Sequence, residues 1–121
     1  CIYILNTLNL YYKDILKNVF GIDYFKEEEI YEFLPYMYLC LVMTVEPGKG
    51  GQKLIPETVE KVSKLKQYIE NNNLDTFIEV DGGINIETVD KVKEAGADIV
   101  VAGSAIISAD DYKEAISKLK I

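Results

Sequence analysis

The sequence contains no histidine and no tryptophan among its 121 residues, and it has only 2 cysteines and 3 prolines. Histidine is the commonest general base and the commonest transition-metal ligand, so any site that this chain builds alone lacks both contributions. Cys1 and Cys40 are too few for a disulfide framework, and Cys40 lies within an apolar run that is typical of a strand. This cysteine usage favours a reduced, cytoplasmic setting.

The chain also lacks a cluster of basic residues and a long hydrophobic run. Its 13 basic and 20 acidic residues give a net charge of -7, which disfavours nucleic acid and anionic membranes as partners. The apolar stretch over residues 33–45 is interrupted by Pro35 and is too short to span a bilayer. We therefore expect neither nucleic acid nor a membrane among the partners of this protein.

The most informative stretch covers residues 39–52. Its first half is a continuous apolar run, which is typical of a strand buried on both faces of a parallel sheet. Its second half contains Pro47 and three glycines, which end the strand and leave a loop with few side chains. At the carboxyl end of a parallel strand, such a loop can bring backbone amides close to a bound anion.

Strands and helices are expected to alternate along the chain. A short helix over residues 27–34, ended by Pro35, precedes a strand over residues 38–45. A helix over residues 56–70 follows, with Ile55, Val59, Val62, Leu65 and Ile69 as its apolar stripe, and then a strand over residues 77–80. The later expected elements are a helix capped by Asn85 with Ile86, Val89, Val92 and Ala95 inward and Gly96 at its end, a strand over residues 99–102, and a last helix that carries Tyr112, Ala115, Ile116 and Leu119 and is opened by Ser108 and Asp111 as a capping box. Glycine follows every strand, so this pattern predicts a parallel sheet whose three strand ends meet at one rim.

Three motifs stand at these predicted strand ends. They are residues 42–52 (VMTVEPGKGGQ), residues 79–84 (EVDGGI) and residues 101–106 (VAGSAI). In order and separation they closely resemble consecutive signatures of the ribulose-phosphate 3-epimerase family. The resemblance runs from about Glu29 to Ile121 and implies an α/β fold, the last three βα units of a (β/α)8 TIM barrel. Residues 29–121 are thus interpreted as the carboxyl-terminal half of a barrel, and residues 1–28 as an atypical segment without a match.

The resemblance also implies a function, an isomerase of the pentose phosphate pathway that interconverts D-ribulose 5-phosphate and D-xylulose 5-phosphate. In such enzymes two aspartates move a proton at carbon 3 while a divalent metal (Zn, Fe, Mn or Co) holds the enediolate. Asp81 matches one of the two aspartates, the proton donor, and also one metal ligand. The remaining positions that the resemblance assigns to substrate binding are Met43 beside the intermediate, Gly48, Lys49, Gly50 and Gly51 in a mobile loop, and Gly82, Gly83, Gly103 and Ser104 in the phosphate pocket.

Two departures from the family pattern are minor: Lys49 stands where an aromatic residue is common, and Tyr38 where an acidic residue is. The severe departure lies at the front of the chain. The family's second aspartate, its two metal-binding histidines and a serine belong to its first three strands, and nothing in residues 1–28 matches them. One carboxylate provides neither the three ligands of a catalytic metal nor proton transfer from two sides. We therefore expect the chain to be inactive alone. The chain begins at Cys1 and not at a methionine, so we expect a fragment or a frameshifted product. A genuine short protein stays open as the alternative.

Plainer interpretations of the same residues stay open. Asp81 could be a turn residue that bonds its own backbone, Met43 could be ordinary core packing, and the glycine loop could be a flexible turn. The whole chain could be a non-catalytic remnant. It could also be a phosphate-binding half-barrel that forms a homo-oligomer through its unpaired strand edges.

Overall fold

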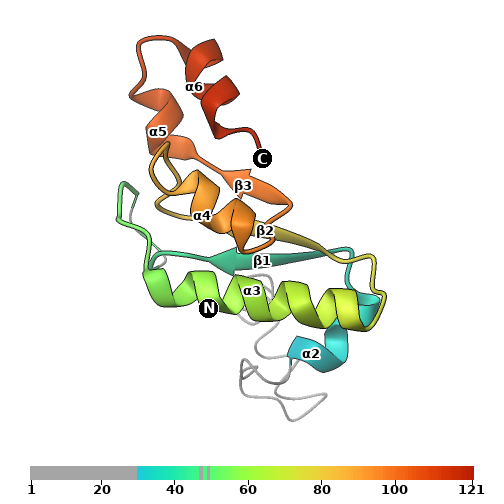
Figure 1. Ribbon diagram of the computed structural model, residues 1–121. Coiled ribbons are helices and arrows are strands. Elements are labelled where there is room, and N and C mark those ends of the chain that lie inside the picture. Colours follow the sequence, from blue (N-terminus) through green and yellow to red (C-terminus); the bar gives the residue numbers. More distant parts are fainter. Residues whose placement is uncertain (1–29, 47, 49) are drawn as a thin grey trace.

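The computed structural model describes residues 30–46, 48 and 50–121, and the predictions for residues 1–28 lie outside this part of the chain (Figure 1). The elements are α2 (Ile30–Phe33), the 3-10 helix η2 (Leu34–Tyr36), β1 (Leu39–Met43), α3 (Pro56–Asn71), β2 (Phe77–Asp81), α4 (Val89–Glu94), β3 (Ile99–Val101), α5 (Gly103–Ile107) and α6 (Tyr112–Leu119). None of these described helices is long and apolar enough to cross a membrane.

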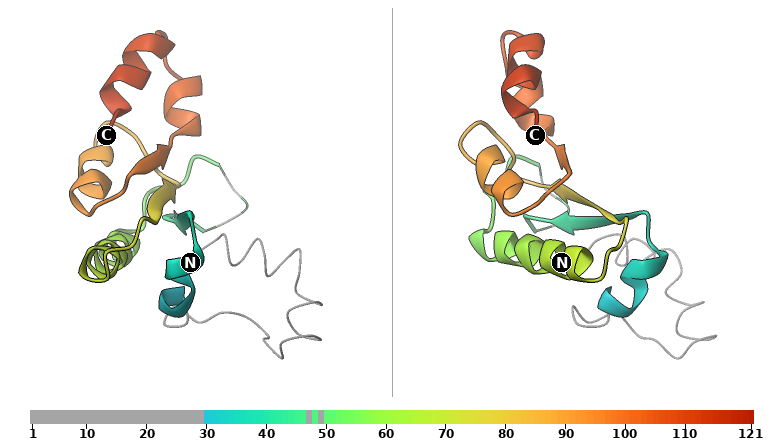
Figure 2. Two further views of the ribbon diagram at one scale, coloured as in Figure 1. Left: turned by 90° about the vertical axis from the view of Figure 1, so that its right-hand side faces the viewer. Right: turned by 45° about the vertical axis from the view of Figure 1, so that its right-hand side comes forward.

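The three strands form one parallel sheet in the order β1–β2–β3. Met43 pairs with Asp81, and Asp81 pairs with Val101, so the last residues of the strands share one row. Helices α3 and α4 cover the same face of this sheet, as the left view of Figure 2 shows. The parallel α/β arrangement that the sequence predicts is therefore confirmed.

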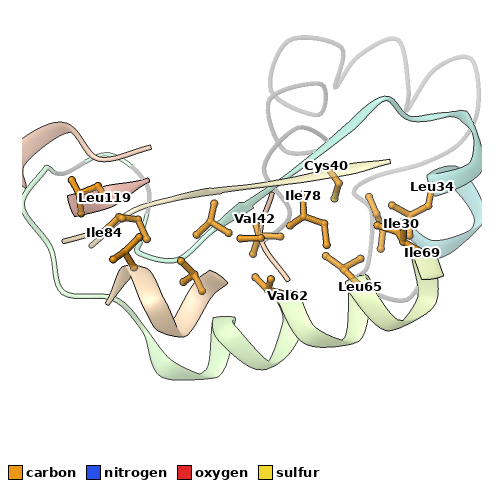
Figure 3. Packing of buried hydrophobic residues seen from close by; sticks show 14 residues of the cluster. Ile30, Leu34, Cys40, Val42, Val62, Leu65, Ile69, Ile78, Ile84 and Leu119 are labelled. Atoms are coloured by element: carbon orange, nitrogen blue, oxygen red, sulfur yellow. The ribbon is translucent and has the colours of Figure 1, made fainter. Parts of the chain in front are cut away.

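The hydrophobic core lies between the sheet and these two helices (Figure 3). The strands contribute Cys40, Val42, Ile78 and Val80, and α3 contributes Val62, Leu65 and Ile69, all of them buried. The three α3 residues are spaced three or four positions apart and form the apolar stripe predicted for that helix. Because the sheet residues alternate between faces, this packing directs every second residue of β1 and β2 toward the helices.

The opposite face of the sheet is not buried, so the prediction of a strand buried on both faces is wrong. Leu41 and Met43 of β1 are only half-buried, and Ile99 and Val101 of β3 are exposed. A strand is buried on both faces when a second layer packs on it, and the described residues provide such a layer on one side only.

The predictions for Pro35 and Asn85 hold with small shifts in the helix bounds. The first α-helix ends at Phe33, before Pro35, and Pro35 itself lies within the 3-10 helix η2 that follows. Asn85 makes the hydrogen bonds of an N-cap residue one turn before α4: its Oδ1 accepts from the Glu87 amide at 2.8 Å and its carbonyl accepts from the Val89 amide at 2.9 Å. The helix begins one turn later, with Thr88 at its N-cap position, and Ile86 is left exposed.

The carboxyl-terminal helices differ from the prediction in a similar way. Asp111, not Ser108, stands at the N-cap of α6, where its carboxylate accepts a hydrogen bond from the Glu114 amide at 3.0 Å. Ser108 instead follows α5, a short helix that the sequence analysis did not predict. Of the expected apolar stripe of α6, Leu119 is buried, whereas Tyr112 and Ile116 are exposed.

The buried thiol of Cys40 is expected to make the fold less stable as the pH becomes alkaline. Burial raises the pKa of this thiol from 9.0 to about 11. The unfolded chain therefore loses its thiol proton first, and the contribution of the neutral thiol is fully present below pH 9 and lost as the pH rises toward 11. We expect this group to remove about 2–3 kcal/mol from the free energy of unfolding over that range. Denaturant unfolding at several pH values should show a shallower decline in Cys40→Ala, and equal declines would contradict the prediction.

Candidate functional site

The carboxyl ends of the three strands open into one cavity of about 280 Å³. It is lined by residues at and just after each strand end, namely Met43, Val45, Glu46, Gly48, Gly50, Gly51, Gln52, Asp81, Gly82, Gly83, Ile84, Val101, Ala102, Gly103 and Ser104. Parallel strands place all their carboxyl ends at one rim, so segments about 60 positions apart in the chain meet here.

Every predicted site residue that the structure describes lines this cavity. Lys49 lies outside the described residues. The cavity brings these residues together, while their roles in binding and proton transfer stay predictions. It also contains Glu46, Gln52 and Ile84, which the sequence analysis quoted within its motifs without assigning them a role.

The chain reversal after β2 depends on two glycines. Gly82 and Gly83 have φ angles of +121° and +67°, a region that residues with a Cβ atom rarely adopt. A Cβ atom on Gly82 would collide with the Val45 side chain, and one on Gly83 would collide with the backbone nitrogen of Leu54. The reversal is therefore packed directly against both ends of the loop that follows β1.

That loop is fixed at its base and open at its tip. The Ile55 amide donates a hydrogen bond to the Thr44 carbonyl at 2.8 Å, which closes the base. Within the loop, the Gln52 side-chain amide donates to the Glu46 carbonyl at 2.5 Å. Gly48 and Gly50 have open space where a side chain would stand. A fixed base with open space around these two glycines suits a loop that closes over a ligand.

The reversal after β3 runs directly into α5, whose first residue is Gly103. Ala102 stands at the N-cap and makes no side-chain cap hydrogen bond. Ser104 lies inside the first turn of the helix and not at its N-cap. Gly103 and Ser104 still line the cavity, and they do so as exposed residues at its third side.

The acidic groups of the cavity are Asp81, which is half-buried at the end of β2, and Glu46, which is exposed. Across residues 30–46, 48 and 50–121, no three histidine, cysteine, aspartate or glutamate side chains come together to hold a metal ion. Catalytic divalent metals generally need about three protein ligands. The described side chains therefore do not fit such an ion by themselves, and Asp81 could supply one ligand of a larger set.

Comparison with known proteins places these motifs in a family. A model of the Ribulose-phosphate 3 epimerase family matches residues 23–107. The chain belongs to the ribulose-phosphate 3-epimerase family. The resemblance carried by the three motifs is thereby confirmed, since the match includes all three motifs. Only the carboxyl-terminal helix α6 lies beyond the matched residues among the described helices and strands.

Individual relatives agree with this family assignment. The chain is 54% identical over 84 residues to the ribulose-phosphate 3-epimerase of Methanocaldococcus jannaschii, and the aligned region covers 69% of this chain and 36% of that protein. It is 46% identical over 87 residues to the ribulose-phosphate 3-epimerase of Synechocystis sp., covering 72% of this chain and 38% of the relative. It is 43% identical over 93 residues to the ribulose-phosphate 3-epimerase of Mycobacterium tuberculosis strain H37Rv, and the aligned region covers 77% of this chain and 41% of that protein. The chain thus spans less than half the length of these epimerases.

Proposed function

We propose that this chain forms the carboxyl-terminal side of a ribulose-phosphate 3-epimerase active site, within the last three βα units of a (β/α)8 barrel. The reaction interconverts D-ribulose 5-phosphate and D-xylulose 5-phosphate. The observation that supports this proposal most strongly is that Asp81 shares one cavity with the glycine turns of all three strands. Bare amides suit a phosphate group and a carboxylate suits proton transfer, and a sugar-phosphate epimerase needs both.

In this proposal Asp81 exchanges a proton with carbon 3 of the sugar phosphate. Removal of the proton next to the carbonyl leaves an enediolate, and return of a proton to the opposite face inverts the carbon. The protonated Asp81 carboxyl donates that proton and becomes a carboxylate, and in the reverse direction the carboxylate accepts it. Met43 lies beside Asp81 in the same row of the sheet and gives the reacting carbons an apolar wall.

In the same proposal, the glycine-lined part of the cavity binds the phosphate group and encloses the sugar. The amides of Gly82, Gly83, Gly103 and Ser104 bind the phosphate group, and the loop with Gly48, Lys49, Gly50 and Gly51 closes over the sugar. Binding the distant phosphate orients the reacting carbon against Asp81, which is how remote binding energy assists a proton transfer.

We further propose that the chain does not epimerise by itself. The whole sequence contains no histidine, and the described side chains form no group that could hold a divalent metal. A metal of that kind stabilises the enediolate oxygens when its ligand set is complete. Inversion also requires an acid–base group on the second face of the substrate. The described cavity contains no second aspartate for this role, and its other acidic residue, Glu46, is exposed.

A second candidate function rests on the uncovered face of the sheet. Phe77, Ile99 and Val101 are large apolar residues that are exposed on it. Exposed apolar strands tend to associate, so this candidate is a non-catalytic half-barrel that forms a homo-oligomer while it still binds phosphate.

The test is a titration of the ¹⁵N-labelled chain with inorganic phosphate, followed by NMR. The amide signals of Gly82, Gly83, Gly103 and Ser104 are expected to shift, because phosphate accepts hydrogen bonds from these groups. Gly96 provides the control, since it also has a positive φ angle but lies before β3, at the other end of the sheet. Unmoved signals at the strand ends with millimolar phosphate would contradict the proposed site.

The same sample tests the remaining parts of the proposal. With ribulose 5-phosphate and added Zn²⁺, Mn²⁺ or Fe²⁺, the chain alone is expected to show no turnover. Turnover that Asp81→Asn abolishes would show that the chain is a complete enzyme. Sedimentation at high concentration separates the two candidates further, because a clean monomer would count against the self-associating half-barrel.

A further inference from the structure

We propose that Thr44 is a positioning residue whose buried hydroxyl group fixes the Asp81–Gly82 turn and so directs the Asp81 carboxylate and the neighbouring glycine amides into the cavity. Its consequence for ligand binding rests on the function proposed above. Thr44 itself does not line the cavity and touches the ligand site only through the residues that it holds.

The contacts of Thr44 all converge on this turn. Its backbone amide donates a hydrogen bond to the Asp81 carbonyl at 2.8 Å, one step beyond the last paired row of β1 and β2. Its hydroxyl oxygen lies 3.1 Å from the Asp81 carbonyl oxygen and 2.5 Å from the Gly82 carbonyl oxygen. The hydroxyl has one proton to donate, so its main hydrogen bond goes to the nearer Gly82 carbonyl, while the Thr44 amide binds the Asp81 carbonyl. One residue thus holds two successive carbonyl groups at the point where the strand ends.

Burial makes the choice of a hydroxyl group matter. The Thr44 side chain is completely buried, so water does not compete for its hydrogen bonds. Beyond the last strand pair, the half-buried Gly82 carbonyl has left the regular ladder, and the Thr44 hydroxyl takes the place of the missing ladder donor. Since Gly82 holds a φ angle of +121°, the turn has little conformational preference of its own and depends on such a contact.

Thr44 also connects this turn to the loop after β1. Its carbonyl oxygen accepts the Ile55 amide hydrogen bond that closes the loop base. The residue after it, Val45, packs against Gly82. The hydroxyl, the amide and the carbonyl of one residue therefore join the loop to the turn that carries Asp81.

A matched control exists at the opposite end of the sheet. Thr76 is also buried, and its hydroxyl oxygen lies 2.8 Å from both the Leu34 and the Met37 carbonyl oxygens. It precedes the first residue of β2, whereas Thr44 follows the last residue of β1. Thr76→Val therefore removes the same kind of buried, shared hydrogen bond without touching the cavity.

The experiment compares Thr44→Val, Thr44→Ser and Thr76→Val by amide hydrogen exchange and by titration with inorganic phosphate. Both valine variants lose a buried hydrogen bond and are expected to unfold more easily. Only Thr44→Val is expected to speed exchange of the Gly82 and Gly83 amides beyond that general loss, and to weaken phosphate binding by roughly three- to tenfold, the fold-change that one net hydrogen bond supplies. Thr44→Ser keeps the hydroxyl group and should restore both properties.

Equal behaviour of Thr44→Val and Thr76→Val at Gly82 and Gly83 would overturn the proposal. If Thr44→Val does not fold, Thr44→Ala and Thr76→Ala make the same comparison without a misplaced methyl group. The two proposals fail separately. A parent chain that does not bind phosphate refutes the proposed phosphate site, whereas the exchange of Gly82 and Gly83 still decides whether Thr44 holds the turn.

Discussion

Gly83→Ala is expected to lower the free energy of unfolding by about 2–5 kcal/mol, the combined effect of a strained backbone and an overpacked contact. Gly83 has a φ angle of +67°, which disfavours any residue with a Cβ atom. The added methyl group would also meet the backbone nitrogen of Leu54, and backbone moves aside less readily than a flexible side chain. Both effects act on the turn that carries Asp81, so the substitution should disturb the cavity as well as the stability.

Gly103→Ala is the matched control for this substitution. Gly103 lines the same cavity, but its backbone has no strained φ angle and a Cβ atom there would enter open space. An alanine at such a position is expected to leave stability unchanged or to raise it by about 0.4–1 kcal/mol. Denaturant unfolding of the two variants measures the difference. Equal stabilities would show that Gly83 does not make the close approach to Leu54.

Ile78→Ala is expected to lower the free energy of unfolding by about 2–5 kcal/mol, the range for a large aliphatic residue truncated in a packed core. Ile78 is 0% exposed in the centre of the sheet and belongs to the main hydrophobic cluster (Figure 3). Its loss leaves a cavity between β2 and the helices, which neighbouring side chains fill only in part. For a chain with one small core, this change alone should unfold a large share of the molecules.

Ile86→Ala tests whether the loss depends on burial instead of residue type. Ile86 is 64% exposed in the turn before α4, so the same substitution there is expected to change the free energy of unfolding by less than about 0.5 kcal/mol. Thermal or denaturant unfolding measures both variants. A similar loss in the two would mean that Ile86 is covered in solution, and that the packing of this region differs from the structure.

The parallel sheet was predictable because two independent signals agree. Each strand is a short apolar run that glycine ends, and each following segment carries apolar residues at helical spacing. The stripe of Val62, Leu65 and Ile69 is the clearest case, since Pro56 marks the start of that helix and all three residues are buried.

The degree of burial was less predictable because a sequence pattern does not say whether a partner surface exists. Ile86, Tyr112 and Ile116 have the spacing of buried residues, yet they are exposed. The same reason explains the uncovered face of β1. Helix starts were misplaced where two polar residues compete, as Ser108 and Asp111 do, because both side chains can accept the same kind of capping hydrogen bond.

The candidate site also contains residues that the sequence identifies and one that it does not. Asp81 and the glycines were identifiable because they follow strand ends, which a parallel sheet necessarily brings to one rim. Thr44 was not identifiable, because its partners Asp81 and Gly82 are more than 35 positions away and a threonine within an apolar strand gives no signal of its own. Its contacts became visible only once the register of β1 and β2 was known.

The face of the sheet on which the Asp81 side chain lies depends on the number of residues in β2. Side chains in a strand alternate between faces, so Asp81 and the buried Val80 point in opposite directions. Lengthening β2 by one residue would turn the carboxylate toward the helices, where an unpaired charge is strongly unfavourable. Lengthening it by two would keep the carboxylate on its present face but move it about 7 Å along the strand, out of the row that it shares with Met43 and Val101.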